Sequence, residues 1–127
     1  MQIGIPAEII AGETRVAATP DTVKKYITAG YTVVVQAGAG VNASVPDASF
    51  SAVGASIVHD AAAAYASDII LKVQAPTAEE IALIKDGATV VAMFDPYRNP
   101  NLAAFAAKNL QCFALELLPR TLSRAQN

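Results

Sequence analysis

The chain has 127 residues, of which 54% are hydrophobic and 16% charged, and its formal net charge at pH 7 is −2. This length predicts a single domain with a sizeable core. The slight negative charge argues against nucleic acid as a main partner, since that role favours a basic face. The apolar composition has two open interpretations: another domain or subunit covers part of the surface, or the domain is simply rich in alanine.

Strands and helices are predicted to alternate along the chain. Thr19 and Pro20 suit the cap and first turn of a helix, and Gly30 suits its end. A capping box formed by Thr77 and Glu80 begins a later helix. The expected strands are residues 1–6, 31–36, 56–58, 68–73, 89–94 and 111–117. The other expected helices are 47–53, 60–66, 77–85 and 100–108, with Asp47, Asp60 and Asn99 as caps.

This alternation predicts the α/β class, with helices on both faces of a parallel sheet. We expect a three-layer αβα domain over residues 1–127, of flavodoxin-like or Rossmann-like type. No apolar run approaches the ~20 residues that a membrane span needs. Cys112 lies in an apolar run and is expected to be a reduced core thiol, which predicts a cytoplasmic protein.

A glycine-rich loop at residues 38–43 follows a strand and resembles a dinucleotide fingerprint. Such a loop must open directly into a helix whose N-terminus holds a pyrophosphate. Here the next helix is expected only from Asp47, and Asp60, the candidate ribose partner, already serves as a cap. We therefore interpret the loop as a turn. His59 has no cluster of metal ligands around it and is expected to be a surface residue, so no metal site is predicted.

Arg15 and Lys72 are candidate site residues because each follows or ends a predicted strand. A lysine in an apolar strand is costly unless it faces a crevice or has a partner. Two interpretations stay open. The two cations hold a ligand carboxylate, or Lys72 pairs with an acid such as Glu8 for structural reasons.

The last segment places Arg120, Ser123, Arg124 and Gln126 in a loop after the final predicted strand. Loops after the carboxyl ends of strands hold the ligands of α/β proteins. No closing signal follows this loop. We expect the chain to be the first domain of a longer polypeptide, carrying half of a site.

The chain resembles the N-terminal domain shared by alanine dehydrogenase and the α subunit of proton-translocating NAD(P) transhydrogenase. The similarity rests on Ile-Gly-Ile-Pro-Ala-Glu at residues 3–8, on Glu-Thr-Arg-Val-Ala-Ala-Thr-Pro at 13–20, and on Asp-Ile-Ile-Leu-Lys-Val at 68–73 with Pro76 behind it. Alanine dehydrogenases carry a catalytic histidine near the position of Asp95, where this chain has none. The tail from Pro119 resembles the transhydrogenase loop, with one residue more between Arg120 and Ser123.

The resemblance implies a role for the tail in binding NAD(H). In transhydrogenases the first arginine and the glutamine of this loop contact the nicotinamide end of NAD(H), which implies cofactor contacts for Arg120 and Gln126, with Arg124 beside them. In alanine dehydrogenases the residues matching Arg15 and Lys72 hold the substrate carboxylate. In the transhydrogenase branch they are expected to be inherited framework.

The resemblance also implies a place in a larger assembly. The parent protein is expected to pass a hydride between NAD(H), held by its own subunit, and NADP(H), held by another subunit or domain, and to couple this transfer to proton translocation. It is expected to be a homodimer, peripheral at the inner membrane through NADP-binding and membrane subunits. The isolated chain is expected to be inactive. The alternatives are an alanine dehydrogenase-like amino-acid dehydrogenase and a non-catalytic binding or assembly module.

Overall fold

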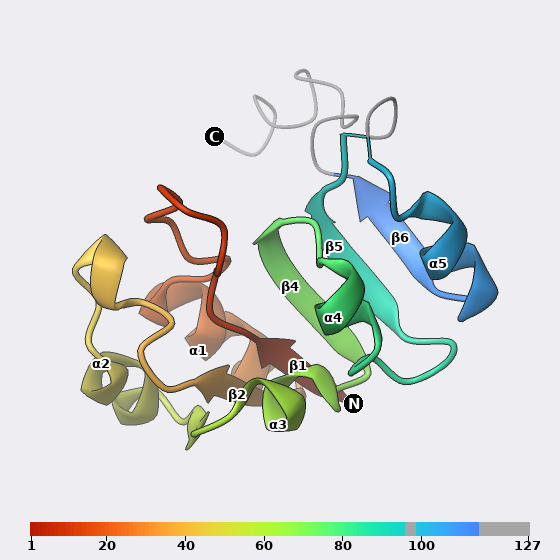
Figure 1. Cartoon of the computed structure of the whole chain (residues 1–127). Helices are drawn as coiled ribbons and strands as arrows, with labels where there is room; N and C mark the ends of the chain where they lie inside the picture. Colours follow the sequence, from red (N-terminus) through yellow and green to blue (C-terminus); the bar gives the residue numbers. More distant parts are fainter. Residues whose placement is uncertain (96–98, 115–127) are drawn as a thin grey trace, which may run out of the picture.

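Six parallel strands form one sheet in the computed structural model, which describes residues 1–95 and 99–114 (Figure 1). Their spatial order is β3-β2-β1-β4-β5-β6, which is the Rossmann order rather than the flavodoxin order. The predicted strands are confirmed with ends that shift by at most one residue, and the end predicted for the last strand lies outside the described residues. The strands are β1 (Gln2–Ile5), β2 (Thr32–Gln36), β3 (Ser56–Val58), β4 (Ile69–Gln74), β5 (Thr89–Met93) and β6 (Gln111–Ala114).

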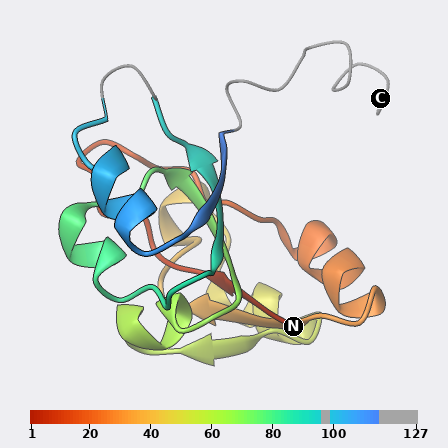
Figure 2. The ribbon, with the colours of Figure 1, turned by 90° about the vertical axis from the view of Figure 1, so that its right-hand side faces the viewer.

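Helices cover both faces of the sheet, as the alternating pattern predicts. Helices α1 (Pro20–Thr28) and α2 (Asp47–Ala52) lie on one face. Helices α3 (Ala61–Tyr65), α4 (Ala78–Ile81) and α5 (Leu102–Ala107) lie on the other, and Figure 2 shows α4 and α5 opposite α1. Right-handed connections explain this division, because the strands step outward from β1 in one direction and from β4 in the other. The expected three-layer αβα architecture is confirmed.

Three of the predicted helix starts are confirmed by side-chain caps. The Thr19 hydroxyl accepts the Thr22 N–H at 3.2 Å at the start of α1. At the start of α4, Thr77 and Glu80 form the predicted capping box. Asp60 accepts the Ala63 N–H at 3.0 Å at the start of α3. These starts could be predicted because donor and acceptor lie three residues apart in the chain.

Two predicted caps are wrong by one or two positions. The residue before α2 is Pro46, and Asp47 lies in the first turn, where its carboxylate accepts the Gly38 N–H at 2.9 Å. The residue before α5 is Asn101, while the Asn99 side chain accepts the Asn101 N–H at 2.8 Å. In both cases the side chain predicted as the cap accepts a backbone N–H that precedes the helix. The residue at the N-cap position itself makes no side-chain cap bond.

Helix α4 ends at Ile81, although the pattern predicts a helix as far as residue 85. After Ile81 the chain continues in tighter turns, with the Ile84 N–H bonded to the Ile81 carbonyl at 3.1 Å. The Lys108 ammonium donates to the carbonyls of Ile81 at 2.9 Å and Ala82 at 3.2 Å. A cation at the last carbonyls stabilises the end of a helix. Because Lys108 lies at the end of α5, 27 residues further along the chain, local sequence could not predict this early end.

The core consists of two clusters, one on each face of the sheet. Between β1, β2 and the helices α1 and α2, the buried members include Ile5, Val35 and Phe50. On the opposite face, Tyr65 and Phe105 pack against the buried side of β4 and β5. The strands β1 and β4 are neighbours in the sheet that lies between the two clusters. Packing on both faces therefore fixes the carboxyl ends of these two strands relative to each other.

Cys112 is exposed, so the prediction of a buried core thiol is wrong. It lies on β6, which among the described strands is at the edge of the sheet and pairs with β5 alone. An edge strand has neighbours on one side only, and Gln111, Cys112 and Phe113 are all exposed. The apolar run therefore predicted the strand correctly, but it did not predict that the side chains of this strand are exposed.

Candidate functional site

A buried ion pair joins the carboxyl ends of β1 and β4. The Lys72 ammonium donates to the Glu8 carboxylate at 2.9 Å and to the Ala7 carbonyl at 3.4 Å. The two charged side chains are 1% and 2% exposed. A charge this deep requires a partner, because loss of hydration costs several kcal/mol per ion. The pairing of Lys72 with Glu8, one of the two interpretations left open by the sequence, is present in the structure.

The Glu8 carboxylate also binds the backbone of β4. It accepts the N–H groups of Val73 at 2.9 Å and of Gln74 at 3.0 Å. The pairing of β4 with β5 shifts register between Leu71 and Gln74, and a shift of this kind leaves N–H groups outside the strand ladder. Glu8 satisfies these donors while it neutralises Lys72, so a single side chain fixes the end of β1 against β4.

Glu80 and Tyr65 complete the surroundings of Lys72 on the α3 and α4 side. The second carboxylate oxygen of Glu80 lies 3.8 Å from the Lys72 ammonium. The Tyr65 hydroxyl is buried and has no hydrogen-bond partner among the described residues. Burial raises the pKa of Tyr65, and the nearby carboxylates of Glu80 and Glu8 raise it further. The sequence predicted Glu80 only as a helix cap and gave no signal for Tyr65.

A second ion pair lies nearby, in the loop between β1 and α1. Arg15 donates to the Glu13 carboxylate through Nε at 2.9 Å and through Nη2 at 2.8 Å. The Gln74 side-chain amide donates to the same carboxylate at 2.7 Å. The hydrogen bonds from Arg15, and next those from Gln74, hold the pKa of Glu13 well below its usual range. Gln74 therefore connects both pairs, through its backbone to Glu8 and its side chain to Glu13.

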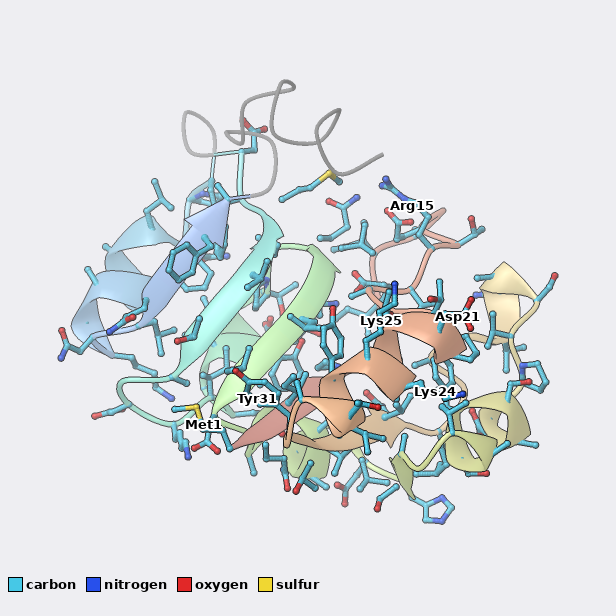
Figure 3. All side chains as sticks on the ribbon, turned by 180° about the vertical axis from the view of Figure 1, so that it is seen from behind. Met1, Arg15, Asp21, Lys24, Lys25 and Tyr31 are labelled. Atoms are coloured by element: carbon cyan, nitrogen blue, oxygen red, sulfur yellow. The ribbon has the colours of Figure 1, made fainter. Side chains whose placement is uncertain are left out.

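The predicted pair Arg15 and Lys72 lines one pocket of about 400 Å³. Arg15 is 59% exposed, whereas the Lys72 ammonium is turned into the interior against Glu8. Figure 3 shows Arg15 on the loop beyond the strand ends. The guanidinium uses two of its five donors on Glu13, which leaves others for a carboxylate or amide. The pocket also contains Val16, Ala17, Tyr26, Leu71, Val73, Val91 and Met93.

The glycine-rich loop does not open into a helix N-terminus. It leads into a 3₁₀ turn over Val41–Ala43, and α2 starts only at Asp47. Gly38 has a φ of +82°, a conformation that glycine adopts without strain. The interpretation of the loop as a turn is therefore confirmed. His59 is exposed in the bend ahead of α3, as expected of a surface residue.

All three predicted cofactor contacts, Arg120, Arg124 and Gln126, lie outside the described residues. Asp95, near which the resemblance predicts the histidine of alanine dehydrogenases, follows β5 and has a φ of +46°. Within residues 1–95 and 99–114, no three His, Cys, Asp or Glu side chains converge as a metal centre would require. None of the helices in this part of the chain is long and apolar enough to cross a membrane.

Comparison with known proteins gives the family. Residues 4–127 match the family described as alanine dehydrogenase/PNT, N-terminal domain. The chain belongs to this family. The resemblance predicted from the short motifs is thus confirmed, and it extends over nearly the whole chain.

Members of the alanine dehydrogenase/PNT family differ in how much of the chain they match. NAD(P) transhydrogenase subunit alpha of Haemophilus influenzae is 44% identical over 99% of this chain, which spans only 24% of that relative. The structure of a transhydrogenase from Sinorhizobium meliloti is 42% identical, covers 99% of this chain and 38% of its own, and superimposes with a TM-score of 0.91. An alanine dehydrogenase of Halomonas elongata is 42% identical but covers 71% of this chain and 24% of its own.

Proposed function

We propose that the chain is the N-terminal domain of an NAD(P) transhydrogenase α subunit. The observation that carries this proposal is whole-chain similarity: the H. influenzae transhydrogenase subunit matches 99% of the chain and the H. elongata alanine dehydrogenase 71%. The absence of a histidine at Asp95 also favours the transhydrogenase branch. In the complete complex, a hydride leaves NADH on this subunit and reduces NADP⁺ on a partner subunit, coupled to proton translocation.

The role of this domain in the reaction is to position the cofactor. A nicotinamide supplies the redox chemistry, and the protein aligns two nicotinamides and keeps water out. We assign the cofactor contacts to Arg120 and Gln126, with Arg124 beside them. A guanidinium offers a fixed fork of donors, and an amide both donates and accepts, so neither serves as a general base at neutral pH. We expect the isolated domain to be inactive, because the second nicotinamide is held by a partner subunit.

The assembly follows from the same proposal. The subunit is a homodimer that holds NAD(H), and it associates with NADP-binding and membrane subunits, which place it peripherally at the inner membrane. Its similarity to transhydrogenase α over the whole chain supports this arrangement.

Arg15 and Lys72 are structural residues in this proposal. Each already has a carboxylate of this chain as partner, Glu13 and Glu8. The alternative, an alanine dehydrogenase-like enzyme in which both cations hold a substrate carboxylate, is favoured by the pocket that they share. The buried Lys72 ammonium argues against it, because contact with a ligand would require Lys72 to leave Glu8.

Single-turnover hydride transfer tests the proposal in the complete complex. Arg120→Ala and Gln126→Asn should each slow transfer by roughly 100-fold, since a shift of about 1 Å can cost that much, with a smaller loss of NADH affinity. His59→Ala is the control and should transfer hydride at the parental rate. Parental rates in both tail variants, or oxidation of L-alanine with NAD⁺, would overturn the assignment.

A further inference from the structure

Helix α4 is a single turn that depends on contacts from other parts of the chain. It has four residues, Ala78–Ile81, and lies over β4 in Figure 1. A helix this short has no stability of its own, because forming the first hydrogen-bonded turn is unfavourable. The end of α4 is held by the Lys108 ammonium, which donates to the carbonyls of Ile81 and Ala82. The contacts at its start therefore decide whether the turn is formed.

A single carboxylate, that of Glu80, holds the start of α4 and also faces the buried cation. Its Oε1 atom accepts the Thr77 N–H at 2.9 Å, while the Thr77 hydroxyl accepts the Glu80 N–H at 3.3 Å. Its Oε2 atom lies 3.8 Å from the Lys72 ammonium. Glu80 is only 6% exposed. Because both oxygens belong to one planar group, a movement that breaks one contact also disturbs the other.

Lys72 is the cation that keeps this carboxylate in the interior. In the described part of the chain, the ion pair with Lys72 is the only one that Glu80 forms. The neighbouring Glu8 has the same sign of charge, and the buried Tyr65 hydroxyl cannot supply a positive charge. A buried carboxylate without a cation is costly. If the ammonium is lost or withdrawn, Glu80 should leave the interior, and the capping box should break.

The turn of α4 connects this buried charge with the outer surface of the molecule. Ile81 and Ile84 face inward and are 3% and 1% exposed, whereas Leu83 between them is 40% exposed. Lys72 lies near the carboxyl end of β4, the edge of the sheet at which α/β proteins hold their ligands. An opening of the turn would therefore carry a change at this edge to the surface around Leu83.

We propose that the folded state of α4 is coupled to the position of the Lys72 ammonium through Glu80. While the ammonium lies between Glu8 and Glu80, the capping box is formed and the turn is closed. Any event that withdraws the ammonium releases Glu80, opens the turn and changes the surface around Leu83. Such a local opening needs much less free energy than unfolding of the whole domain. The coupling lies within this chain and does not depend on the proposed function.

Amide hydrogen exchange of the 127-residue chain, followed by NMR, tests the coupling. The informative amides are Thr77, Ile81 and Ala82, because α4 and its cap hold all three N–H groups in hydrogen bonds. Lys72→Met should speed their exchange about tenfold, as for the loss of a helix cap. Addition of Glu80→Gln should restore the parental rate, since a glutamine keeps the capping box and needs no cation.

The matched control is Val35→Ala, which removes buried contacts in β2 and destabilises the whole domain without altering the α4 cap. Exchange at the three amides should stay parental in this variant, because they exchange by opening of α4 and not by global unfolding. Denaturant unfolding completes the comparison. Lys72→Met/Glu80→Gln should remain less stable than the parent chain, because Glu8 still lacks its cation, even though the α4 amides are protected again.

Parental exchange at α4 in Lys72→Met, equal acceleration in Val35→Ala, or no recovery on adding Glu80→Gln would each overturn the proposal. If Lys72→Met does not fold, Glu8→Gln/Lys72→Met takes its place, because Glu80 is again left without a cation. Glu80→Gln is then added to that pair, with the same expected recovery. The hydride-transfer experiment uses none of these variants, so failure of either proposal is visible separately.

Discussion

At the scale of single residues, the charge on Lys72 determines what the site can do. Its ammonium is 1% exposed and lies between two carboxylates, Glu8 at 2.9 Å and Glu80 at 3.8 Å. Removing one member of a buried ion pair leaves an uncompensated charge, whereas an exposed pair contributes little. Lys72 and Glu8 are therefore coupled to stability whether or not they also meet a ligand.

Replacing Lys72 separates a structural role from a ligand-binding role. Lys72→Met should reduce the free energy of unfolding by about 3–5 kcal/mol, because Glu8 and Glu80 lose their cation. Denaturant unfolding of the chain measures this change. Lys24→Met is the matched control: Lys24 is exposed and unpaired within the described residues, and its loss should cost less than about 0.5 kcal/mol.

The double variant Glu8→Gln/Lys72→Met sharpens the test. If the pair is the source of the cost, the two changes together should destabilise by less than the sum of the single changes. Additive losses would show that Lys72 contributes through packing and not through Glu8.

At the scale of elements, the approach of α3 to β1 depends on a missing side chain. A Cβ on Gly4 would collide with the Ala64 carbonyl and lie 2.5 Å from the Ser67 hydroxyl oxygen. That hydroxyl also receives the Gln2 side-chain amide at 2.8 Å. The strand and the helix are thus in contact through backbone, and this contact sets the position of Tyr65 near Glu80.

Gly4→Ala should therefore be costly even though Gly4 has an ordinary backbone conformation. The added methyl must push backbone apart, so we expect a loss of roughly 3 kcal/mol, at the upper end for overpacking. Gly87→Ala is the control, because Gly87 has open space around it and a φ of +80°, which costs roughly 1–2 kcal/mol for a residue with a Cβ. Thermal unfolding compares the two, and equal losses would mean that the close approach is not limiting.

The ends and the burial of the helices and strands could be predicted from the sequence only in part. Thr19, Asp60 and the Thr77–Glu80 box were predictable because each cap bonds three residues away. The early end of α4 was not, because Lys108 arrives from another helix. The exposure of Cys112 was not predictable either, since an apolar run indicates a strand but not what covers it.

Some residues of the candidate site could likewise be predicted from the sequence, and others could not. An acid partner for Lys72 could be predicted, because a buried lysine demands one and Glu8 follows the adjacent strand. The double hydrogen bond from Arg15 to Glu13 was not predicted, although the two residues lie only two positions apart in the chain. That spacing alone does not determine where the two side chains point. Gln74 and Tyr65 had no signal at all, because both act through long-range packing.

At the scale of the whole molecule, the domain has a Rossmann strand order without a site for a dinucleotide phosphate among its described residues. The loop after β2 leads to a 3₁₀ turn of three residues rather than to a helix. Asp47 places a carboxylate in the first turn of α2 and takes the Gly38 N–H. Phosphate sites use free N–H groups and a positive helix end, and here an internal anion already occupies that position.

The 127-residue chain should therefore bind NADH only weakly, although its fold is of the dinucleotide-binding type. Calorimetric titration of NADH into the chain measures this. Asp47→Asn is the decisive variant: if the loop were a phosphate site masked by Asp47, removing the negative charge should increase NADH affinity markedly. We expect no such increase, because the loop still opens into a turn and the helix still starts beyond it. A micromolar dissociation constant for the parent chain would show that this domain binds the cofactor on its own, and a marked gain of affinity in Asp47→Asn would assign that binding to residues 38–43.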